Sequence, residues 1–451
     1  METLKKIWNA LFVEDSGVKK YFLNTGWLLI ARGTQMIVSL IVGGLVARYL
    51  GPDQYGVYNY VISFVAIFAA LSTMGIASVV VKDIVSGKTD EATALGSGFG
   101  LKLAGSILAY LLIIGMSFFV EAAGAVRLLL AIAAFQIITK TTEIINSYYQ
   151  AKVASSKTVK AQLLSLVIIN LLRITFILLN KPLLWFICLL PVDAIIIGFG
   201  LVKYLSLTDA KISNWRFDRK YTKELLSESW PSLFSGIFVT IYMKIDQVML
   251  QQMLGDTSVG YYAAAVRLSE VWLSIPWILS GSLFPAMVNA FKEGKSAFKI
   301  RINQAYILLI SIALLVAIPI ALTSPWIINL IFGAQYQESA SVLTIHIFSC
   351  VFIFLGSVSN RWLIIHKLQR YWMYYSAAGA LANVMLNIWL IPEYGILGAA
   401  YATLISYAFA YYFVFALFKP TRELFLIQTK NFFRVVTIIP AWKEIRKLRI
   451  R

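Results

Sequence analysis

Long runs of apolar residues follow one another along almost the whole chain, separated by short polar segments. Most runs are long enough for a helix to cross the roughly 30 Å hydrocarbon core of a bilayer, which takes about 20 residues. The pattern predicts twelve membrane-spanning helices, so both chain ends lie on one side of the membrane. The twelve predicted helices lie near 24–47, 55–81, 97–120, 127–147, 159–180, 182–204, 230–254, 258–290, 303–325, 338–365, 371–391 and 394–418.

The composition agrees with this pattern and excludes an ordinary soluble enzyme. Of the 451 residues, 59% are hydrophobic and 14% are charged, whereas soluble domains average about 45–50% and about 25%. Residues 1–23 lack a long apolar core followed by a small-residue cleavage site. We therefore expect this segment to be retained on the cytoplasmic side and not to act as a signal peptide.

The formal net charge of +18 follows from the predicted topology. Thirty of the 40 lysines and arginines fall in the N-terminal segment, alternate connections and the C-terminal tail, whereas Arg48, Arg127 and Lys181 fall on the opposite side. Cytoplasmic loops of membrane proteins carry such an excess of cations. Both termini are therefore predicted to be cytoplasmic, and nucleic-acid binding is not needed to explain the charge.

A short pattern recurs in the first hairpin of each half of the chain. Gly51, Gly56 and Tyr58 recur as Gly255, Gly260 and Tyr262, each 204 residues later. Glycine permits a tight turn and close packing between helices, so two copies of one hairpin would both have glycine at the equivalent positions. The recurrence favours a duplicated unit, and an even number of spans per copy makes the repeat parallel about an axis along the membrane normal.

The predicted architecture is an all-α polytopic membrane protein with two pseudo-symmetric six-helix lobes around a central cavity. The polar segment 205–229 is predicted to be a cytoplasmic linker. It separates an N-terminal segment and lobe, 1–204, from a C-terminal lobe, 230–418. Residues 419–451 form a basic tail that we expect to be cytoplasmic or interfacial, with a helix lying in the interface and no thirteenth span.

Eleven charged residues fall inside the predicted spans, more than two residues from either end. A charge at the centre of a membrane helix costs about 2.5–3.5 kcal/mol by insertion measurements, so such residues usually face a polar cavity and carry function. Arg173, Lys244 and Arg267 lie nearest the predicted midplane. The others are Arg32 and Lys140, towards the cytoplasmic side, Lys102 and Arg361, near helix ends where they can reach the membrane surface, and the acids Glu143, Asp193, Asp246 and Glu270.

Two cation–acid pairs are spaced three residues apart, Lys140 with Glu143 and Arg267 with Glu270. Residues at this spacing share a helix face, so each pair is either a structural ion pair or part of a functional cavity.

Lys244 and Asp246 point about 200° apart on a helix, so at least one needs a partner on another helix. Asp193 follows Pro191 and is either functional or a hydrogen-bonded residue near a helix bend.

The sequence holds no phosphate-binding loop, hydrolase nucleophile elbow or zinc-protease motif. We therefore expect no catalytic residues, no metal site, and no cofactor other than a coupling ion, H⁺ or Na⁺.

The stretch 47–58, ARYLGPDQYGVY, resembles the first-hairpin signature of bacterial polysaccharide-biosynthesis membrane proteins. These are O-antigen-type flippases for lipid-linked oligosaccharides, within the multidrug/oligosaccharidyl-lipid/polysaccharide exporter superfamily. Segments 244–250, 259–262, 265–268 and 394–403 support the resemblance, which covers about 20–418. It implies a transporter that moves an undecaprenyl-pyrophosphate-linked sugar unit to the outer leaflet of the bacterial cytoplasmic membrane by alternating access, alongside a polysaccharide polymerase and glycosyltransferases.

Cations in the membrane suit such a substrate, because its pyrophosphate must cross an apolar layer. We expect the headgroup to be bound by Arg173, Lys244 and Arg267, with Arg32 and Lys140 nearer the entrance. We expect the four span acids, Asp246, Glu270, Glu143 and Asp193, to position these cations or to couple transport to an ion.

Two alternatives remain. A proton- or sodium-coupled drug antiporter would favour acidic cavity residues for cationic substrates, whereas the span charges here sum to a cationic excess. A membrane-embedded glycosyltransferase or polymerase is disfavoured by the short outer connections and by the lack of a carboxylate cluster for sugar chemistry.

Overall fold

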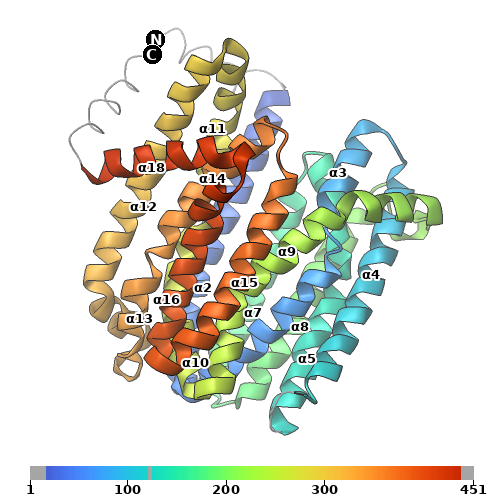
Figure 1. The fold of residues 1–451 in the computed structure, drawn as a ribbon. Helices are drawn as coiled ribbons and strands as arrows, with labels where there is room; N and C mark the ends of the chain where they lie inside the picture. Colours follow the sequence, from blue (N-terminus) through green and yellow to red (C-terminus); the bar gives the residue numbers. More distant parts are fainter. Residues whose placement is uncertain (1–16, 120–123, 438–451) are drawn as a thin grey trace. The chain divides into compact units, whose positions relative to one another are not determined.

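The computed structural model describes residues 17–119 and 124–437, with side chains described from residue 33 onwards (Figure 1). Every regular element within these ranges is a helix. Among the described residues, eleven helical stretches are long and apolar enough to cross a membrane. The first, Gly33–Ser86, has 54 residues, turns at Gly51, and has a summed helical rise of about 80 Å, enough for two passes. The predicted all-α multi-pass fold is therefore confirmed.

Contacts divide the chain into two compact units. The N-unit contains the residues up to Tyr49 together with Phe64–Ile237, and the C-unit contains Leu50–Ser63 together with the residues from Phe238. The division differs from the predicted lobes in two places. Residues 50–63 pack with the C-unit, and the boundary falls inside a helix, beyond the predicted linker.

The N-unit holds α2 apart from its residues 50–63, and all elements as far as the first part of α9. Its core is built from buried aliphatic and tyrosine side chains of α3, α4, α6, α8 and α9. At the start of α4 the Asp90 carboxylate accepts a 2.9 Å hydrogen bond from the backbone N–H of Thr93, which caps the helix. The elements are α2 (Gly17–Ser72), α3 (Ala77–Ser86), α4 (Glu91–Met116), α5 (Gly124–Thr139), η1 (Lys140–Ile144), α6 (Ile145–Ala151), α7 (Ser156–Leu178), α8 (Leu183–Leu205), η2 (Ile212–Asn214) and α9 (Arg219–Leu254).

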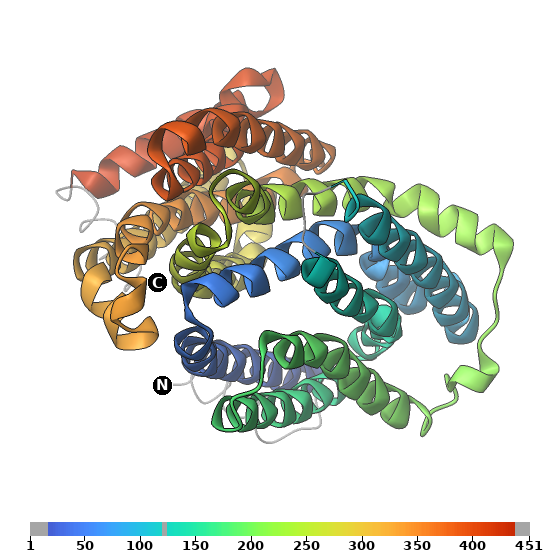
Figure 2. The same ribbon diagram turned by 90° about the horizontal axis from the view of Figure 1, so that it is seen from below.

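The predicted linker is partly helical. Figure 2 shows the light-green segment running from the end of α8 through η2 to the start of α9. Arg216 N–H donates to the Ala92 carbonyl at 3.2 Å, and Asp218 N–H donates to the Ser97 hydroxyl at 3.0 Å. These bonds attach the linker to the start of α4.

The C-unit contains the rest of α9 and the remaining helices. A cluster of tyrosines, Tyr242, Tyr407 and Tyr411, lies in its core. The elements are α10 (Asp256–Glu270), η3 (Val271–Leu273), α11 (Ser274–Glu293), α12 (Lys295–Phe332), η4 (Ala334–Tyr336), α13 (Ser339–His346), α14 (Ser349–Ile365), α15 (Arg370–Tyr394), α16 (Ile396–Ala408), the π-helical segment η5 (Phe409–Phe413), α17 (Val414–Leu417), η6 (Lys419–Thr421) and α18 (Arg422–Val436).

The two recurring glycines adopt nearly the same backbone conformation. Gly51 has φ 71° and ψ 168°, and Gly255 has φ 84° and ψ 178°. A side chain would be strained at these positive φ values, which explains why both turns use glycine. The repeated hairpin predicted from the sequence is therefore present in the structure.

The second helices of the two hairpins cross each other at the other recurring glycines. A Cβ atom added to Gly56 would lie 1.8 Å from the carbonyl oxygen of Asp256, and one added to Gly260 would lie 1.9 Å from that of Pro52. Each copy thus presses its glycine against the first turn of the other. We call this contact the glycine crossing.

Side-chain hydrogen bonds continue the contact on either side of the glycine crossing. Thr257 Oγ1 donates to Asp53 Oδ1 at 3.2 Å, and Ser63 Oγ donates to Gln247 Oε1 at 2.8 Å. These bonds explain why residues 50–63 belong to the C-unit although they are close in sequence to the N-unit.

The C-terminal helix α18 is short and is not among the candidate membrane spans. Figure 1 shows it lying crosswise to α12 of the same unit, and it packs on α12, α17 and η5. As far as residue 437, this arrangement agrees with the prediction of a helix and no thirteenth span in the tail, and the prediction for 438–451 lies outside the described residues.

Replacing Gly260 by alanine should lower the thermal stability of the protein, because backbone atoms that cannot rotate away block the new methyl group. Overpacking of this kind costs about 1–3 kcal/mol. Thermal unfolding of the purified protein in detergent measures the loss. Gly281→Ala is the matched control, since its Cβ would meet only the end of the Arg361 side chain at 3.5 Å. Equal melting temperatures for Gly260→Ala and the control would contradict the tight crossing.

Candidate functional site

Three charged candidates meet at the packed faces of α9 and α10 in the C-unit. Lys244 Nζ donates to Glu270 Oε1 at 2.9 Å, and the two side chains are 22% and 29% exposed. Arg267 is partly buried, lies beside Tyr55 and Tyr58, and is near enough to Glu270 for their charges to interact. The three charges sum to one positive charge in an apolar region, and Lys244 and Glu270 remain accessible.

The ion pair joins different residues from those that the spacing suggested. Arg267 and Glu270 are three residues apart, yet the ion pair of Glu270 in the described structure is made by Lys244 from the neighbouring helix. Packing of α10 against α9 brings Lys244 to the carboxylate, whereas Arg267 turns towards the tyrosines of residues 50–63.

Asp246 lies two residues after Lys244 and is 2% exposed. Its carboxylate accepts hydrogen bonds from the Tyr262 hydroxyl at 2.7 Å, from Asn387 Nδ2 at 2.5 Å and from the Thr403 hydroxyl. These donors are neutral and come from α10, α15 and α16. A buried carboxylate held by neutral groups alone is costly, because desolvating a charge needs an opposite charge or a proton to offset it.

Both Lys244 and Asp246 therefore have partners on other helices, whereas their angular separation predicted such a partner for at least one of them. The two recurring tyrosines also lie beside charged candidates. Tyr58 is next to Arg267 and Tyr262 bonds to Asp246.

In the N-unit, Lys140 and Glu143 lie in the 3-10 segment η1, which interrupts the helix between α5 and α6. Both are partly buried. Lys102 also reaches this segment, because its ammonium nitrogen lies 3.5 Å from the Lys140 carbonyl oxygen. Helix α4 packs against η1 in the same unit. The reach of Lys102 to the membrane surface stays a prediction.

The other N-unit candidates have local partners. Arg173 is partly buried, and its Nη1 donates to Asn170 Oδ1 at 3.3 Å. Asp193 accepts a 2.5 Å hydrogen bond from Ser165, as expected for a hydrogen-bonded residue near the Pro191 bend. The Arg32 side chain lies outside the described residues.

Arg361 lies in α14 of the C-unit and packs beside an aromatic ring, and its reach to the membrane surface stays a prediction. Its guanidinium carbon lies 5.5 Å from the centre of the Phe284 ring. Its Nε is buried and lacks a hydrogen-bond partner among the described atoms.

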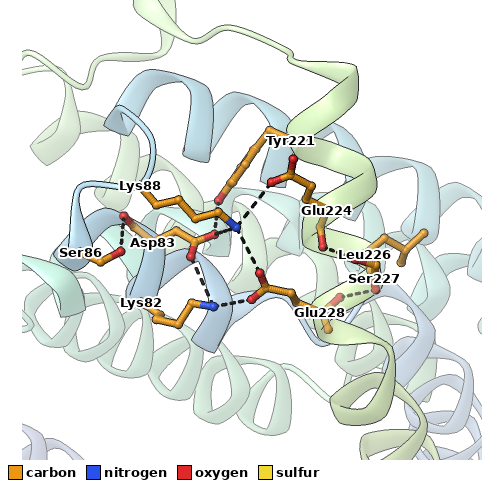
Figure 3. A network of polar contacts seen from close by, with 10 residues as sticks. Lys82, Asp83, Ser86, Lys88, Tyr221, Glu224, Leu226, Ser227 and Glu228 are labelled. Atoms are coloured by element: carbon orange, nitrogen blue, oxygen red, sulfur yellow. Dashed lines mark hydrogen bonds and ion pairs between the residues drawn. The ribbon is translucent and has the colours of Figure 1, made fainter.

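A separate charged network binds the start of α9 to α3 within the N-unit (Figure 3). Lys88 Nζ lies 3.1 Å from Glu228 Oε1 and 3.5 Å from Glu224 Oε2, and Lys82 also pairs with Glu228. The buried Asp83 accepts a 3.2 Å hydrogen bond from the Tyr221 hydroxyl. We call this set the α3–α9 network.

The strength of the α3–α9 network is limited by solvent. The bond to Glu228 raises the pKa of Lys88, but the lysines and glutamates of the network are 37% to 57% exposed. Exposed pairs contribute about 0.2–1 kcal/mol each. The network therefore holds α9 in place chiefly by the number of its contacts.

Comparison with known proteins identifies the family. Residues 22–291 match the family described as "Polysaccharide biosynthesis protein", which is more than half of the chain. The chain belongs to this family. Residues 231–389 also match the MatE family. The resemblance predicted from the first hairpin is thus confirmed.

Curated relatives of this chain are distant, and the matches with three of them cover at least three quarters of each chain. A putative O-antigen transporter of Shigella flexneri is 23% identical over 400 residues, which are 84% of this chain and 92% of the relative. A capsular polysaccharide biosynthesis protein of Staphylococcus aureus is 21% identical over 87% of this chain and 99% of its own. A probable low-salt glycan biosynthesis flippase of Haloferax volcanii is 25% identical over 80% and 76%.

Solved structures of other proteins share the fold of this chain. The lipid II flippase MurJ, in an inward closed conformation, matches with a TM-score of 0.67 and 16% identity over 94% of this chain and 95% of its own. An inward-facing multidrug resistance transporter of the MOP superfamily matches with a TM-score of 0.66 and 15% identity over 91% and 99%. The chain therefore has the two-lobe fold of this superfamily.

Sequence reasoning missed three residues around Asp246 in this family member: Asn383, Asn387 and Thr403. Asn387 bonds to Asp246 and to Asn383, and both asparagines are fully buried. Their spacing of four residues in an apolar helix places them on one face. This signal was available in the sequence, but it did not indicate which helix the asparagines would meet.

Replacing both Glu224 and Glu228 by glutamine should loosen the start of α9 without unfolding the protein. Amide hydrogen exchange of residues 219–228 should accelerate about two- to fivefold, as expected when exposed ion pairs worth up to about 1 kcal/mol are lost. Glu293→Gln, an exposed acid in the C-unit, is the control. Unchanged exchange in the double variant would show that the α3–α9 network does not hold α9.

Proposed function

We propose that the protein is a flippase that moves an undecaprenyl-pyrophosphate-linked oligosaccharide repeat unit from the cytoplasmic to the outer leaflet. The membrane is the bacterial cytoplasmic membrane, with both termini cytoplasmic, and the pathway is surface polysaccharide biosynthesis. Family membership and the names of the relatives support this proposal. The observation that carries it is the accessible, net-cationic group of Lys244, Arg267 and Glu270 inside membrane helices.

The Lys244 ammonium would exchange its ion pair for the substrate. When no substrate is bound, a lysine in an apolar region needs a counter-ion, and the Glu270 carboxylate supplies one. A pyrophosphate carries more negative charge than one carboxylate, so it can share Lys244 with Glu270 and recruit Arg267, whose planar guanidinium suits phosphate oxygens. Without substrate, the Glu270 carboxylate thus offsets the charge of Lys244 and lowers the cost of burying it.

The N-unit would contribute Arg173 and Lys140, with Arg32 nearer the entrance. Each is a cation in or near a candidate membrane-spanning helix. Cations are rare in such helices unless they carry a function. In this proposal Glu143 and Asp193 position cations of the same unit, and the polyprenyl chain stays in lipid.

Asp246 is the proposed coupling residue. Its carboxylate is surrounded by neutral donors, so a bound proton or a sodium ion would offset its buried charge. Oxygen atoms suited to a hard cation lie close by, on Thr403, Tyr262 and the asparagine amides. No other cofactor is proposed. Asp246 lies two residues from Lys244, so a change in its ionisation can be transmitted along α9.

Transport would follow alternating access. The headgroup binds on the cytoplasmic side, the protein changes conformation, and the headgroup is released outside. A membrane potential that is negative inside assists outward movement of the anion by about 2.3 kcal/mol per charge per 100 mV. Glycosyltransferases would supply the substrate and a polymerase would consume it, and the chain itself would catalyse no covalent step.

The MatE match to residues 231–389 keeps a drug antiporter as the alternative. A cationic drug would need an accessible acidic group. Asp246 is buried, and Glu270 is already paired with Lys244. If the protein were a membrane glycosyltransferase or polymerase, the purified protein would elongate sugar chains in vitro.

Replacing Lys244 by glutamine should lower flipping about 10- to 100-fold, because a hydrogen bond to a charged group contributes about 1.5–3 kcal/mol. The measurement is movement of a fluorescent undecaprenyl-pyrophosphate oligosaccharide across reconstituted proteoliposomes, with Lys203→Gln, an exposed lysine at the end of α8, as the control.

A double variant separates substrate binding from structural pairing. Lys244→Gln with Glu270→Gln removes both charges of the ion pair. If Lys244 only neutralises Glu270, the double variant should flip as fast as the wild type. If Lys244 binds the pyrophosphate, it should remain slow.

Replacing Asp246 by asparagine should abolish the response of flipping to an imposed ion gradient, because the ionisable group is lost while its size is kept. We expect the wild-type rate to respond to a gradient of H⁺ or of Na⁺ in proteoliposomes and the variant rate to respond to neither. Asp209→Asn, an exposed residue of the linker, serves as the control. A variant that keeps the wild-type response would place coupling elsewhere.

A further inference from the structure

Helix α18 is attached to the C-unit by buried polar groups. Gln428 and Asn431 are fully buried. Gln428 Nε2 donates to Ser359 Oγ at 2.7 Å and to the Tyr411 carbonyl at 3.1 Å, and Asn431 Nδ2 donates to Asn303 Oδ1 at 2.7 Å. Together with Leu424 and Ile427 these residues form the face that packs on the protein.

The opposite side of α18 is unusually apolar for an exposed surface. Leu426 is 62% exposed, Phe433 is 61% exposed and Val436 is 49% exposed. At 100° per residue these three side chains lie within about 80° of one another around the helix. A soluble surface helix would carry polar residues at these positions.

Arg422, in the first turn, is exposed on the same side as Phe433, whereas three other charged residues occupy a third side of α18. Lys430 is exposed, and it lies with Arg434 and Glu423 within about 40° around the helix. From 419 to 437 there are four cations and one acid. The sequence from 438 to 451 adds five cations and one acid.

We propose that α18 is an in-plane helix that binds the anionic phospholipid surface of the cytoplasmic leaflet. The apolar stripe of Leu426, Phe433 and Val436 enters the boundary between headgroups and acyl chains, as in interfacial amphipathic helices. Lys430 and Arg434 lie at the headgroups and attract lipids of negative charge, as basic segments near a membrane surface do. This proposal depends only on α18 and holds whatever the transported substrate is.

The attachment of α18 makes the lipid contact relevant to the candidate site. Gln428 bonds to the Tyr411 carbonyl, and the Tyr411 hydroxyl bonds to that of Tyr242 at 2.5 Å. Tyr242 lies two residues before Lys244 on α9. Lipid bound to α18 therefore stabilises the part of the C-unit that carries the cationic group.

The position of α18 is tested with a fluorescent probe on single cysteines in the full chain, after Cys188→Ser and Cys350→Ala remove the native thiols. The probe at Leu426→Cys should be quenched by lipids carrying a spin label near the headgroup in nanodiscs. The probe at Glu423→Cys should be quenched mainly by aqueous iodide. Iodide quenching of the Leu426→Cys probe equal to that at Glu423→Cys, with no quenching by spin-labelled lipid, would overturn the proposal and point to a protein partner or bulk water at this face.

The charge requirement is tested by the melting temperature in nanodiscs of phosphatidylcholine with and without phosphatidylglycerol. We expect the anionic lipid to raise the melting temperature of the wild type and of the control Lys211→Gln with Lys220→Gln. The increase should be at least halved in Lys430→Gln with Arg434→Gln. An equal increase in the α18 variant would show that α18 does not recognise lipid charge.

Discussion

The close crossing of two helices at Gly56 and Gly260 is the contact on which the arrangement of the C-unit depends. With no side chain at either position, the backbones of residues 52–56 and of the first turns of α10 come into direct contact. This contact fixes α10 from one side while Tyr262 bonds it to α9 and α16 from the other. Since α10 carries Arg267 and Glu270, the crossing also sets the place of the charged group.

A second constraint is the cost of charge in an apolar medium. The structure meets it in two ways. Accessible charges are paired, as with Lys244 and Glu270, whereas the enclosed Asp246 is given only neutral hydrogen-bond donors. The first arrangement can exchange partners with an anionic ligand, and the second can take up a small cation or a proton. Their proximity on one helix gives a physical route for coupling the two.

Much of the fold was predictable from the sequence because membrane helices follow a one-dimensional signal. The multi-pass all-α architecture and the repeated hairpin at Gly51 and Gly255 were of this kind. The partner of Glu270 was not, because sequence spacing favoured Arg267 and only helix packing brings Lys244 nearer. The contact of Lys102 with the Lys140 carbonyl was not predictable for the same reason, since hydropathy indicates depth in the membrane but not which neighbour a side chain meets.

The central claim is that the cations bind the pyrophosphate of a lipid-linked sugar. The most direct measurement is the affinity of the full chain in nanodiscs for two polyprenyl lipids with the same oligosaccharide, one linked through pyrophosphate and one through an uncharged linker. The account predicts at least about tenfold tighter binding of the pyrophosphate lipid, equivalent to about 1.4 kcal/mol, with the difference shrinking in Lys244→Gln. Equal affinities for the two lipids would contradict it.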